Sequence, residues 1–294
     1  MLHSAIAVIN SRTTAARPGS ASAGADADDV LRPLTPRSIV LSVLLGRHPP
    51  AMPVAQLLAF TSLFGIADGT TRTALSRLVA AGDLVVDDGR YRLADRLLAR
   101  QQEQDTGRAG PSAAWDGTWW FVVVVAERRT VAERREFRTR AVGARLGELR
   151  PDVWIRPANV ELAVELPGVV VTRGPLTAGD GPTLVGRLWD LEDLERRSRQ
   201  LVAELDETIA SLAAPAAVDR LPPAFTAMAR AQRFLRAEPQ LPAELSPHRS
   251  ATMLRERYEA ANAGFQDALR AFFTHRPAPT AASPRDRALS TDGR

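Results

Sequence analysis

The stretch TTRTALSRLVAAGDLVVDDGRYRL, residues 70–93, decides the fold of the first part of this sequence. It predicts a helix over 70–81 that ends at Gly82, because its apolar side chains recur at helical spacing. The face they form consists of Thr71, Ala74, Leu75, Leu78 and Val79. The helix is followed by LVVDDGRYRL, which predicts two short strands joined by the two-residue turn Asp88-Gly89.

Two further helices are expected before this stretch. Thr35 as N-cap and Pro36 at the first helical position predict one helix that stops at Gly46. A second should follow Pro53 and reach Gly65. Three helices and a hairpin in this order are typical of a winged helix-turn-helix, here assigned to residues 34–105.

The opposite face of the third predicted helix carries short hydroxyls and arginines: Thr70, Arg72, Thr73, Ser76 and Arg77. Such a face can lie in the major groove of DNA, where Arg reads guanine and Ser or Thr contacts phosphates or bases. Arg90 and Arg92 on the hairpin suit a minor groove or backbone, and Arg37 is a further phosphate candidate. The alternatives are a merely solvated face and a winged helix that binds protein.

Charge supports this DNA-binding hypothesis only mildly. Between Thr35 and Arg100 there are 8 arginines and 5 acidic residues. A single copy with so small a surplus should bind DNA weakly. We therefore expect a homodimer that reads two half-sites of double-stranded DNA about 34 Å apart.

The amino-acid composition excludes several classes of catalytic mechanism. The 294 residues include no cysteine and no lysine, and the four histidines, His3, His48, His248 and His275, are scattered. Thiol nucleophiles, Cys-ligated zinc, P-loop lysines and Schiff bases are therefore excluded. We expect no enzyme activity, catalytic residue, metal or cofactor. Since no apolar run approaches the roughly 20 residues of a membrane span, we expect a cytoplasmic protein.

A second block, residues 114–186, predicts an α+β unit of the ferredoxin-like type. WDGTWWFVVVVAE predicts a buried strand, and Thr130 with Glu133 predicts a capping box for the next helix. LRPDVWIRP and PGVVVTRG each predict one more strand. The arginine face of that helix could meet DNA, coenzyme phosphates or solvent, and it consists of Arg134, Arg135, Arg138, Arg140 and Arg145.

Polar residues 101–114 and a Gly/Pro stretch over 174–186 are expected to separate this block from its neighbours. The third block, 187–274, is helical, with leucines at spacings of three and four after Asp190, a helix after Pro222-Pro223, and another through Tyr258 and Phe265. Its apolar stripes are expected to be core or a dimer seam, with a ligand pocket as the alternative. Residues 1–33 and 275–294 are expected to be disordered tails.

The chain resembles the PaaX-like family of bacterial transcriptional regulators, named for the repressor of phenylacetic-acid degradation. The segments that carry the resemblance, in order, are RTALSRLVAAGDL (72–84), WDGTWWFVVV (115–124), LRPDVWIRP (149–157), LWDLEDLERR (188–197) and RFLRAEPQLPAEL (233–245).

The resemblance implies a dimeric repressor of a catabolic operon, released from its operator by a small-molecule effector such as an aryl- or acyl-CoA thioester. It places Arg72, Thr73, Ser76 and Arg77 on the recognition helix, and Arg128, Arg129, Arg134, Arg135 and Arg138 are candidates for the coenzyme phosphates. A rival hypothesis is a nuclease or RNA-binding protein built on the middle block.

Overall fold

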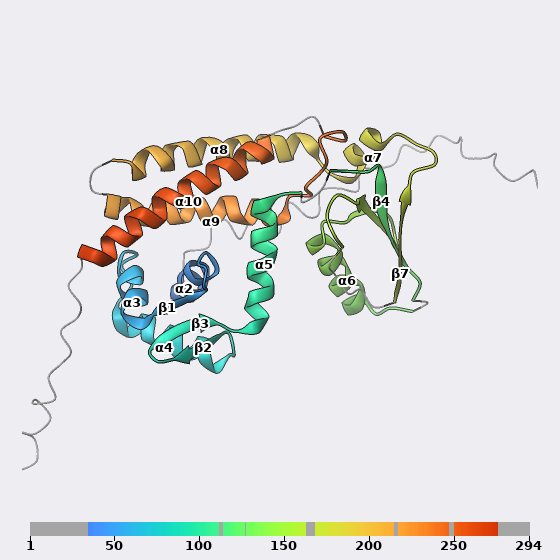
Figure 1. The fold of residues 1–294 in the computed structure, drawn as a ribbon. Helices are drawn as coiled ribbons and strands as arrows, with labels where there is room; N and C mark the ends of the chain where they lie inside the picture. The colour runs from blue at the N-terminus through green and yellow to red at the C-terminus, as the bar shows by residue number, and fades with distance from the viewer. Residues whose placement is uncertain are drawn as a thin grey trace, which may run out of the picture. The chain divides into compact units, whose positions relative to one another are not determined.

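A computed structural model describes residues 35–111, 114–126, 128–162, 168–214, 217–246 and 250–275 (Figure 1). The fold below is that of the unit Leu34–Arg294, as far as its residues are described. The two predicted tails lie outside the described residues, with one correction. His275 ends the last helix instead of opening a tail, because that helix continues unbroken from Ser250.

The N-terminal section, residues 35–93, contains three helices and a three-stranded antiparallel sheet. These elements are α2 (Pro36–Leu45), β1 (Ala51–Pro53), α3 (Val54–Ser62), α4 (Asp68–Ala80), β2 (Leu84–Asp87) and β3 (Arg90–Leu93). The N-cap of α2 is Thr35, whose side chain accepts a hydrogen bond from the amide of Ser38. The hairpin turn has φ values of 45° at Asp88 and 68° at Gly89, as a turn of this length favours.

Strand β1 was not expected from the sequence. It pairs with β3 in the sheet order β1-β3-β2, with Ala51 opposite Arg92 and Pro53 opposite Arg90. A three-residue strand that ends in proline has too few residues to show an alternating pattern. It nevertheless pairs with the edge of β3 that is opposite β2, so the hairpin is part of a three-stranded sheet.

Residues 101–114, expected to separate two blocks, are mostly helical, which the sequence did not indicate. Helix α5 (Asp95–Ala109) runs through most of that stretch. Its polar residues are good helix formers, and the polar Gln101 is itself buried because its side-chain amide donates to the carbonyls of Leu45 and Arg47. An apolar pattern cannot reveal a helix that docks through hydrogen bonds.

The middle section, residues 118–188, has a four-stranded antiparallel sheet and two helices. In chain order they are β4 (Thr118–Val124), α6 (Val131–Gly143), β5 (Gly147–Arg150), β6 (Val153–Pro157), β7 (Val169–Pro175) and α7 (Gly181–Leu188). The sheet order is β5-β6-β4-β7. The predicted capping box is confirmed, since Thr130 and Glu133 bond each other's backbone amides.

One prediction for this section is wrong, and one stretch has structure that was not expected. LRPDVWIRP forms two strands instead of one, because Pro151-Asp152 makes a turn in which Asp152 takes a φ of 66°. The Gly/Pro stretch 174–186 contains the start of α7, which Asp180 caps and in which Pro182 is the second residue. That this stretch separates two blocks stays a prediction. One sheet face packs on α6 through Phe137 and Trp154, and the other buries Trp119 and Ile155.

The C-terminal section consists of three long helices and one short 3-10 turn. These are α8 (Leu191–Leu212), η1 (Ala217–Arg220), α9 (Leu221–Ala237) and α10 (Ser250–His275), and the three long helices lie side by side in Figure 1. Asp190 caps α8 as predicted, accepting from the amide of Asp193. None of the helices in the described part of the chain has the length and apolar character of a membrane span.

One hydrophobic core joins the N-terminal and C-terminal sections. It contains Phe60 of α3, Phe225 of α9 and Phe265 of α10, and the rings of Phe60 and Phe225 meet edge to face with centroids 5.3 Å apart. The helices that precede the hairpin are therefore buried against helices from the C-terminal end of the described chain. The domain boundaries predicted above remain predictions.

Candidate nucleic-acid interface

Helix α4 presents two different faces. Thr71, Leu75 and Leu78 are fully buried against the rest of the N-terminal section. The outward residues are all exposed: Thr70, Arg72, Thr73, Ser76 and Arg77. The division into inner and outer faces that the helical spacing predicted is therefore confirmed, whereas contact of the outer face with DNA stays a prediction.

A buried hydrogen bond fixes the inner face of α4. The hydroxyls of Thr71 and Thr61 lie 2.8 Å apart, and Thr61 also donates to the carbonyl of Leu57 on its own helix α3. Both threonines are 0% exposed. A buried hydroxyl is costly without a partner, so this pair sets the rotation of α4 about its axis and hence the direction of its outer face.

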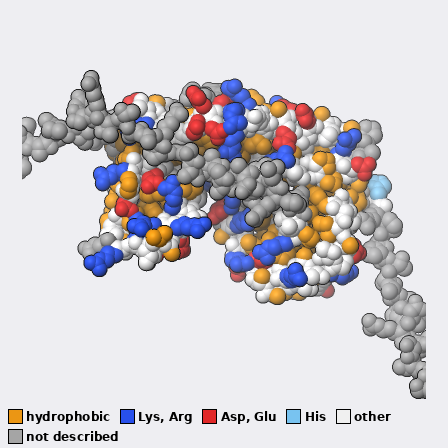
Figure 2. All heavy atoms as spheres, turned by 180° about the vertical axis from the view of Figure 1, so that it is seen from behind, with side chains coloured by type: hydrophobic (Ala, Val, Ile, Leu, Met, Phe, Trp, Pro, Cys, Tyr) orange, Lys and Arg blue, Asp and Glu red, His pale blue; other side chains and the backbone are white. Residues whose placement is uncertain are grey.

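The arginines of the outer face and the hairpin have no acidic partner in the part of the chain that the structure describes. Arg72, Arg77, Arg90 and Arg92 are exposed, and none forms an ion pair with a carboxylate of the described residues. In Figure 2 basic side chains gather at the end of the N-terminal section that holds α4 and the hairpin. Guanidinium groups that are left unpaired are available for phosphate or base contacts.

Arg37, another predicted phosphate contact, has a structural role. Its Nη2 lies 2.8 Å from the carboxylate of Asp83, which is 1% exposed and also pairs with Arg96. Asp83 thus connects the start of α2, the turn after α4 and the first turn of α5. The guanidinium of Arg37 keeps an exposed side, and its contact with phosphate remains a prediction.

Arg47 belongs to this surface and was not singled out from the sequence. It follows α2, and burial together with the positive charge of Arg90 lowers the pKa of its guanidinium. Like charges held close together favour a bound anion. A count of charges along the chain could not identify this residue, because its proximity to Arg90 depends on how the hairpin folds back toward α2.

The arginines predicted to hold an effector fall into two groups. Arg129 pairs with Asp152 and stacks on Phe137, and Arg138 pairs with Glu148 and stacks on Trp154. The other three, Arg128, Arg134 and Arg135, are exposed. No group of three or more His, Cys, Asp or Glu side chains in the described residues could hold a metal ion.

The structure defines a mixed α/β protein in which a short helical section presents one basic, unpaired face. A model of the PaaX-like protein family matches residues 35–97, that is, the N-terminal section and the start of α5. The chain is also similar to the solved structure of the uncharacterized protein Rv0674 from Mycobacterium tuberculosis. The two share 36% sequence identity with a TM-score of 0.65, over 82% of this chain and 100% of that one. This chain belongs to the PaaX-like family. No curated protein matches it.

Proposed function

We propose that this protein is a transcriptional repressor that binds operator DNA as a homodimer through a winged helix-turn-helix. In this proposal α4 is the recognition helix, the β2-β3 hairpin is the wing, and the middle section is a ferredoxin-like unit. The observation that carries it is the exposed face of α4, where Arg72 and Arg77 stand among short hydroxyls with no acidic partner in the described residues.

The side chains of this face suit the major groove. Thr70, Thr73 and Ser76 are short, so the helix backbone can approach the base edges closely, and the two longer arginines can reach guanine. Arg90 and Arg92 of the hairpin lie on alternate residues of β3 and can contact the flanking backbone or minor groove. Arg47 adds a further contact to phosphate.

Release of the operator by a small molecule is the second part of the proposal. Membership of the PaaX-like family supports a regulator, and the exposed Arg128, Arg134 and Arg135 offer contacts to the phosphates of an aryl- or acyl-CoA thioester. A ligand that binds only the folded state raises its melting temperature. A panel of such thioesters should therefore contain at least one stabiliser, and no shift at saturating concentration would contradict this class of effector.

The test of DNA binding uses the full chain and the DNA upstream of its own gene and of neighbouring operons. We expect fluorescence anisotropy to show at least one fragment bound far more tightly than random DNA of equal length, with a strong salt dependence. Equal affinity for every fragment and for random DNA would reject a sequence-specific repressor. It would favour the alternative in which the winged helix binds protein.

A further inference from the structure

Strand β7 forms one edge of the sheet in the middle section and pairs only with β4 among the described residues. The sheet order is β5-β6-β4-β7, and the pairing covers the whole strand, from Val169 opposite Val124 to Pro175 opposite Thr118. Figure 1 shows the two strands side by side at this edge. An edge strand leaves every second backbone amide and carbonyl without a partner in the sheet.

The register identifies the backbone groups of β7 that point away from β4. The amide of Val125 donates to the carbonyl of Gly168 at 3.0 Å, and these two residues are opposite each other when the β4-β7 register is continued by one step. In an antiparallel pair, positions that bond the neighbouring strand alternate with positions that do not. The even-numbered residues of β7 therefore bond β4, whereas Val169, Val171 and Arg173 direct their amides and carbonyls outward.

The side chains of this edge are apolar and uncovered. Residues 169–172 read VVVT and carry no charge. Val170 is 52% exposed and Val171 is 43% exposed. Because neighbouring residues of a strand point to opposite faces of the sheet, both faces of the edge are open to solvent. Val125, beside the start of β7, is 55% exposed. A regular apolar edge of this kind is a site at which strands associate.

The opposite edge of the same sheet is protected against strand addition. Strand β5 has only four residues, its register with β6 shifts between Glu148 and Arg150, and Glu148 forms an ion pair with α6. The end of α7 also lies close to this edge, since a Cβ on Gly147 would lie 3.0 Å from the Cβ of Leu188. Short length, an irregular register and charge all disfavour pairing with a further strand. Strand β7, by contrast, has seven residues in one unbroken register.

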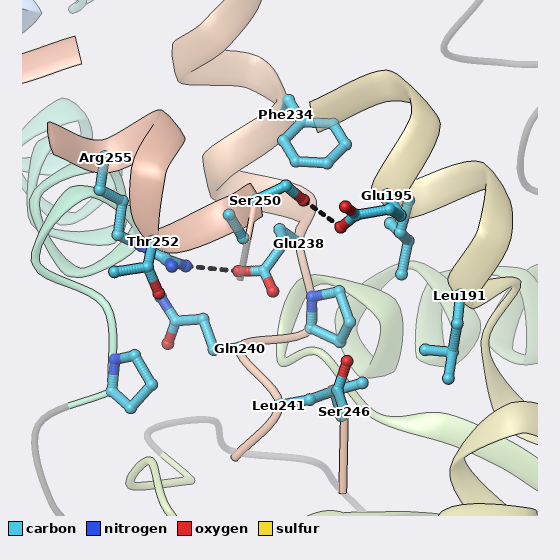
Figure 3. A pocket seen from close by; sticks show the side chains of 14 residues that line it. Leu191, Glu195, Phe234, Glu238, Gln240, Leu241, Ser246, Ser250, Thr252 and Arg255 are labelled. Atoms are coloured by element: carbon cyan, nitrogen blue, oxygen red, sulfur yellow. Dashed lines mark hydrogen bonds and ion pairs between the residues drawn. The ribbon is translucent and has the colours of Figure 1, made fainter. Parts of the chain in front are cut away.

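A hollow beside α8, α9 and α10 is a less favourable place for a partner. The ionisable side chains that line it are Glu195, Glu238 and Arg255. Arg255 pairs with Glu238, and Ser250 donates to Glu195 (Figure 3). Glu195 is also paired with Arg199. A partner in the hollow would have to displace these contacts, whereas a strand beside β7 would only add hydrogen bonds.

We propose that β7 pairs antiparallel with β7 of a second copy of this chain, about a two-fold axis at Val171. In this register Val171 lies opposite Val171, and Val169 lies opposite Arg173. Every backbone amide and carbonyl that points outward between these residues then has a partner. The two four-stranded sheets become one continuous sheet. A two-fold pairing also closes the open edge of both copies at once, whereas an unrelated strand would leave its own outer edge open.

The charges of β7 favour pairing with a second copy. Its one charged residue is Arg173, whose Nη2 lies 2.6 Å from a carboxylate oxygen of Asp116 in the same chain. The two-fold register places each Arg173 opposite a valine, so like charges are not opposite each other. At the centre two valines meet, and β-branched side chains suit such a position. That this pairing sets the distance between the two α4 helices rests on the proposed function, whereas the pairing itself does not.

Association is tested by sedimentation of the full chain in the absence of DNA. We expect the parent chain to be a dimer and Val171→Lys to be a monomer at the same concentration, because two lysines would lie directly opposite each other. Val131→Lys, the same change at an exposed residue of α6, should remain a dimer. Thermal melting should show all three chains folded, since both valines are exposed. A monomeric parent chain, or a Val171→Lys variant that is still dimeric, would overturn the pairing.

The register is tested with single cysteines, because the natural chain has none. Opposed residues at a hydrogen-bonded position have Cα atoms about 5.5 Å apart, which a disulfide spans. Val171→Cys should therefore form a disulfide-linked dimer on mild oxidation. Val131→Cys is the control, and it should cross-link far more slowly although residue 131 is more exposed. Equal rates for the two variants would overturn the two-fold axis at Val171.

The link to operator binding is tested separately with the same variants. Val171→Lys should bind a complete operator more weakly than the parent chain does, but a single half-site equally well, because only the complete operator engages both copies. Unchanged affinity of the monomeric variant for the complete operator would show that the pairing has no role in operator recognition. A chain that binds no DNA would reject the proposed function while leaving the sedimentation and cross-linking results to stand.

Discussion

Thr71 of α4 and Thr61 of α3 share a buried hydrogen bond, 2.8 Å between their hydroxyl oxygens. Thr61 donates to the carbonyl of Leu57, so the Thr71 hydroxyl is the donor between the two. Thr71, on the otherwise apolar inner face of α4, thus gives the helix a polar contact that depends on direction. This contact therefore fixes the orientation of the opposite face of α4, which carries Arg72 and Arg77.

A double-mutant cycle on this pair tests the contact. Thr71→Val keeps the shape of the side chain and should lower the free energy of unfolding by about 1 kcal/mol. The double variant Thr61→Val/Thr71→Val should cost less than the sum of the two single variants, because it leaves no unpaired hydroxyl. Urea denaturation measures all three, and strictly additive losses would contradict a direct bond.

Arg72→Ala and Arg77→Ala test the recognition face. Each should weaken operator binding by about 1 to 3 kcal/mol if the arginine contacts a base, and the loss should be smaller on random DNA. Arg187→Ala, an exposed arginine of α7 with the same change in charge, is the control and should bind the operator normally. Full operator affinity in the double variant Arg72→Ala/Arg77→Ala would show that α4 does not contact the operator.

Asp83→Asn tests the connection made by Arg37, Asp83 and Arg96. The buried carboxylate pairs with two arginines whose side chains are 56% and 60% exposed. In the variant both guanidinium groups stay hydrated, so neither becomes a buried, unpaired charge. We expect a loss of about 1 to 2 kcal/mol in the free energy of unfolding, discounted for this exposure. Asp87→Asn, an exposed acid on β2, should change stability little. Equal losses in the free energy of unfolding for the two substitutions would show that the ion pairs of Asp83 do not stabilise the fold.

The sequence predicted well those elements whose signals are local. Thr35 and Pro36 mark the start of α2, Asp88-Gly89 marks the hairpin, and the leucine spacing of α4 separates its faces, all within a few residues. The outer face of α4 followed from the same spacing, since residues that are not buried on a helix must point outward.

The remaining features depend on contacts between distant parts of the chain. Helix α5 has little apolar character because it docks through Gln101 and Gly107, and the missing side chain of Gly107 lets α5 approach the backbone of Leu235. Arg156 was read as part of an ordinary strand, yet it is buried against a carbonyl 83 residues later. No pattern within β6 could predict that partner.

Phe225→Ala tests the core shared by the first and last sections. Phe225 is 7% exposed and contacts Phe60, Phe64 and Phe265, so its truncation should cost about 3 to 5 kcal/mol. Hydrogen exchange should show α3 and α9 losing protection together, because one core holds both. Met253→Ala on the exposed side of α10 should have little effect. Loss of protection confined to the C-terminal helices would contradict a single core.

Arg156→Lys tests how the buried cation is held. Burial, and after it the charge of Arg145, lowers the pKa of Arg156 to about 10, which still leaves it protonated at neutral pH. A lysine begins from a lower pKa and cannot reach the three carbonyls that Arg156 bonds, so the same burial should bring its pKa toward the neutral range. A base whose pKa is lower in the folded state binds fewer protons there, so stability rises with pH between the folded and unfolded pKa values. Urea denaturation from pH 7 to 9 should therefore show the variant regaining about 1 to 3 kcal/mol relative to the parent chain. A constant difference between the two across this range would mean that water, or a rearrangement of residues Glu238–Gln240, solvates the lysine.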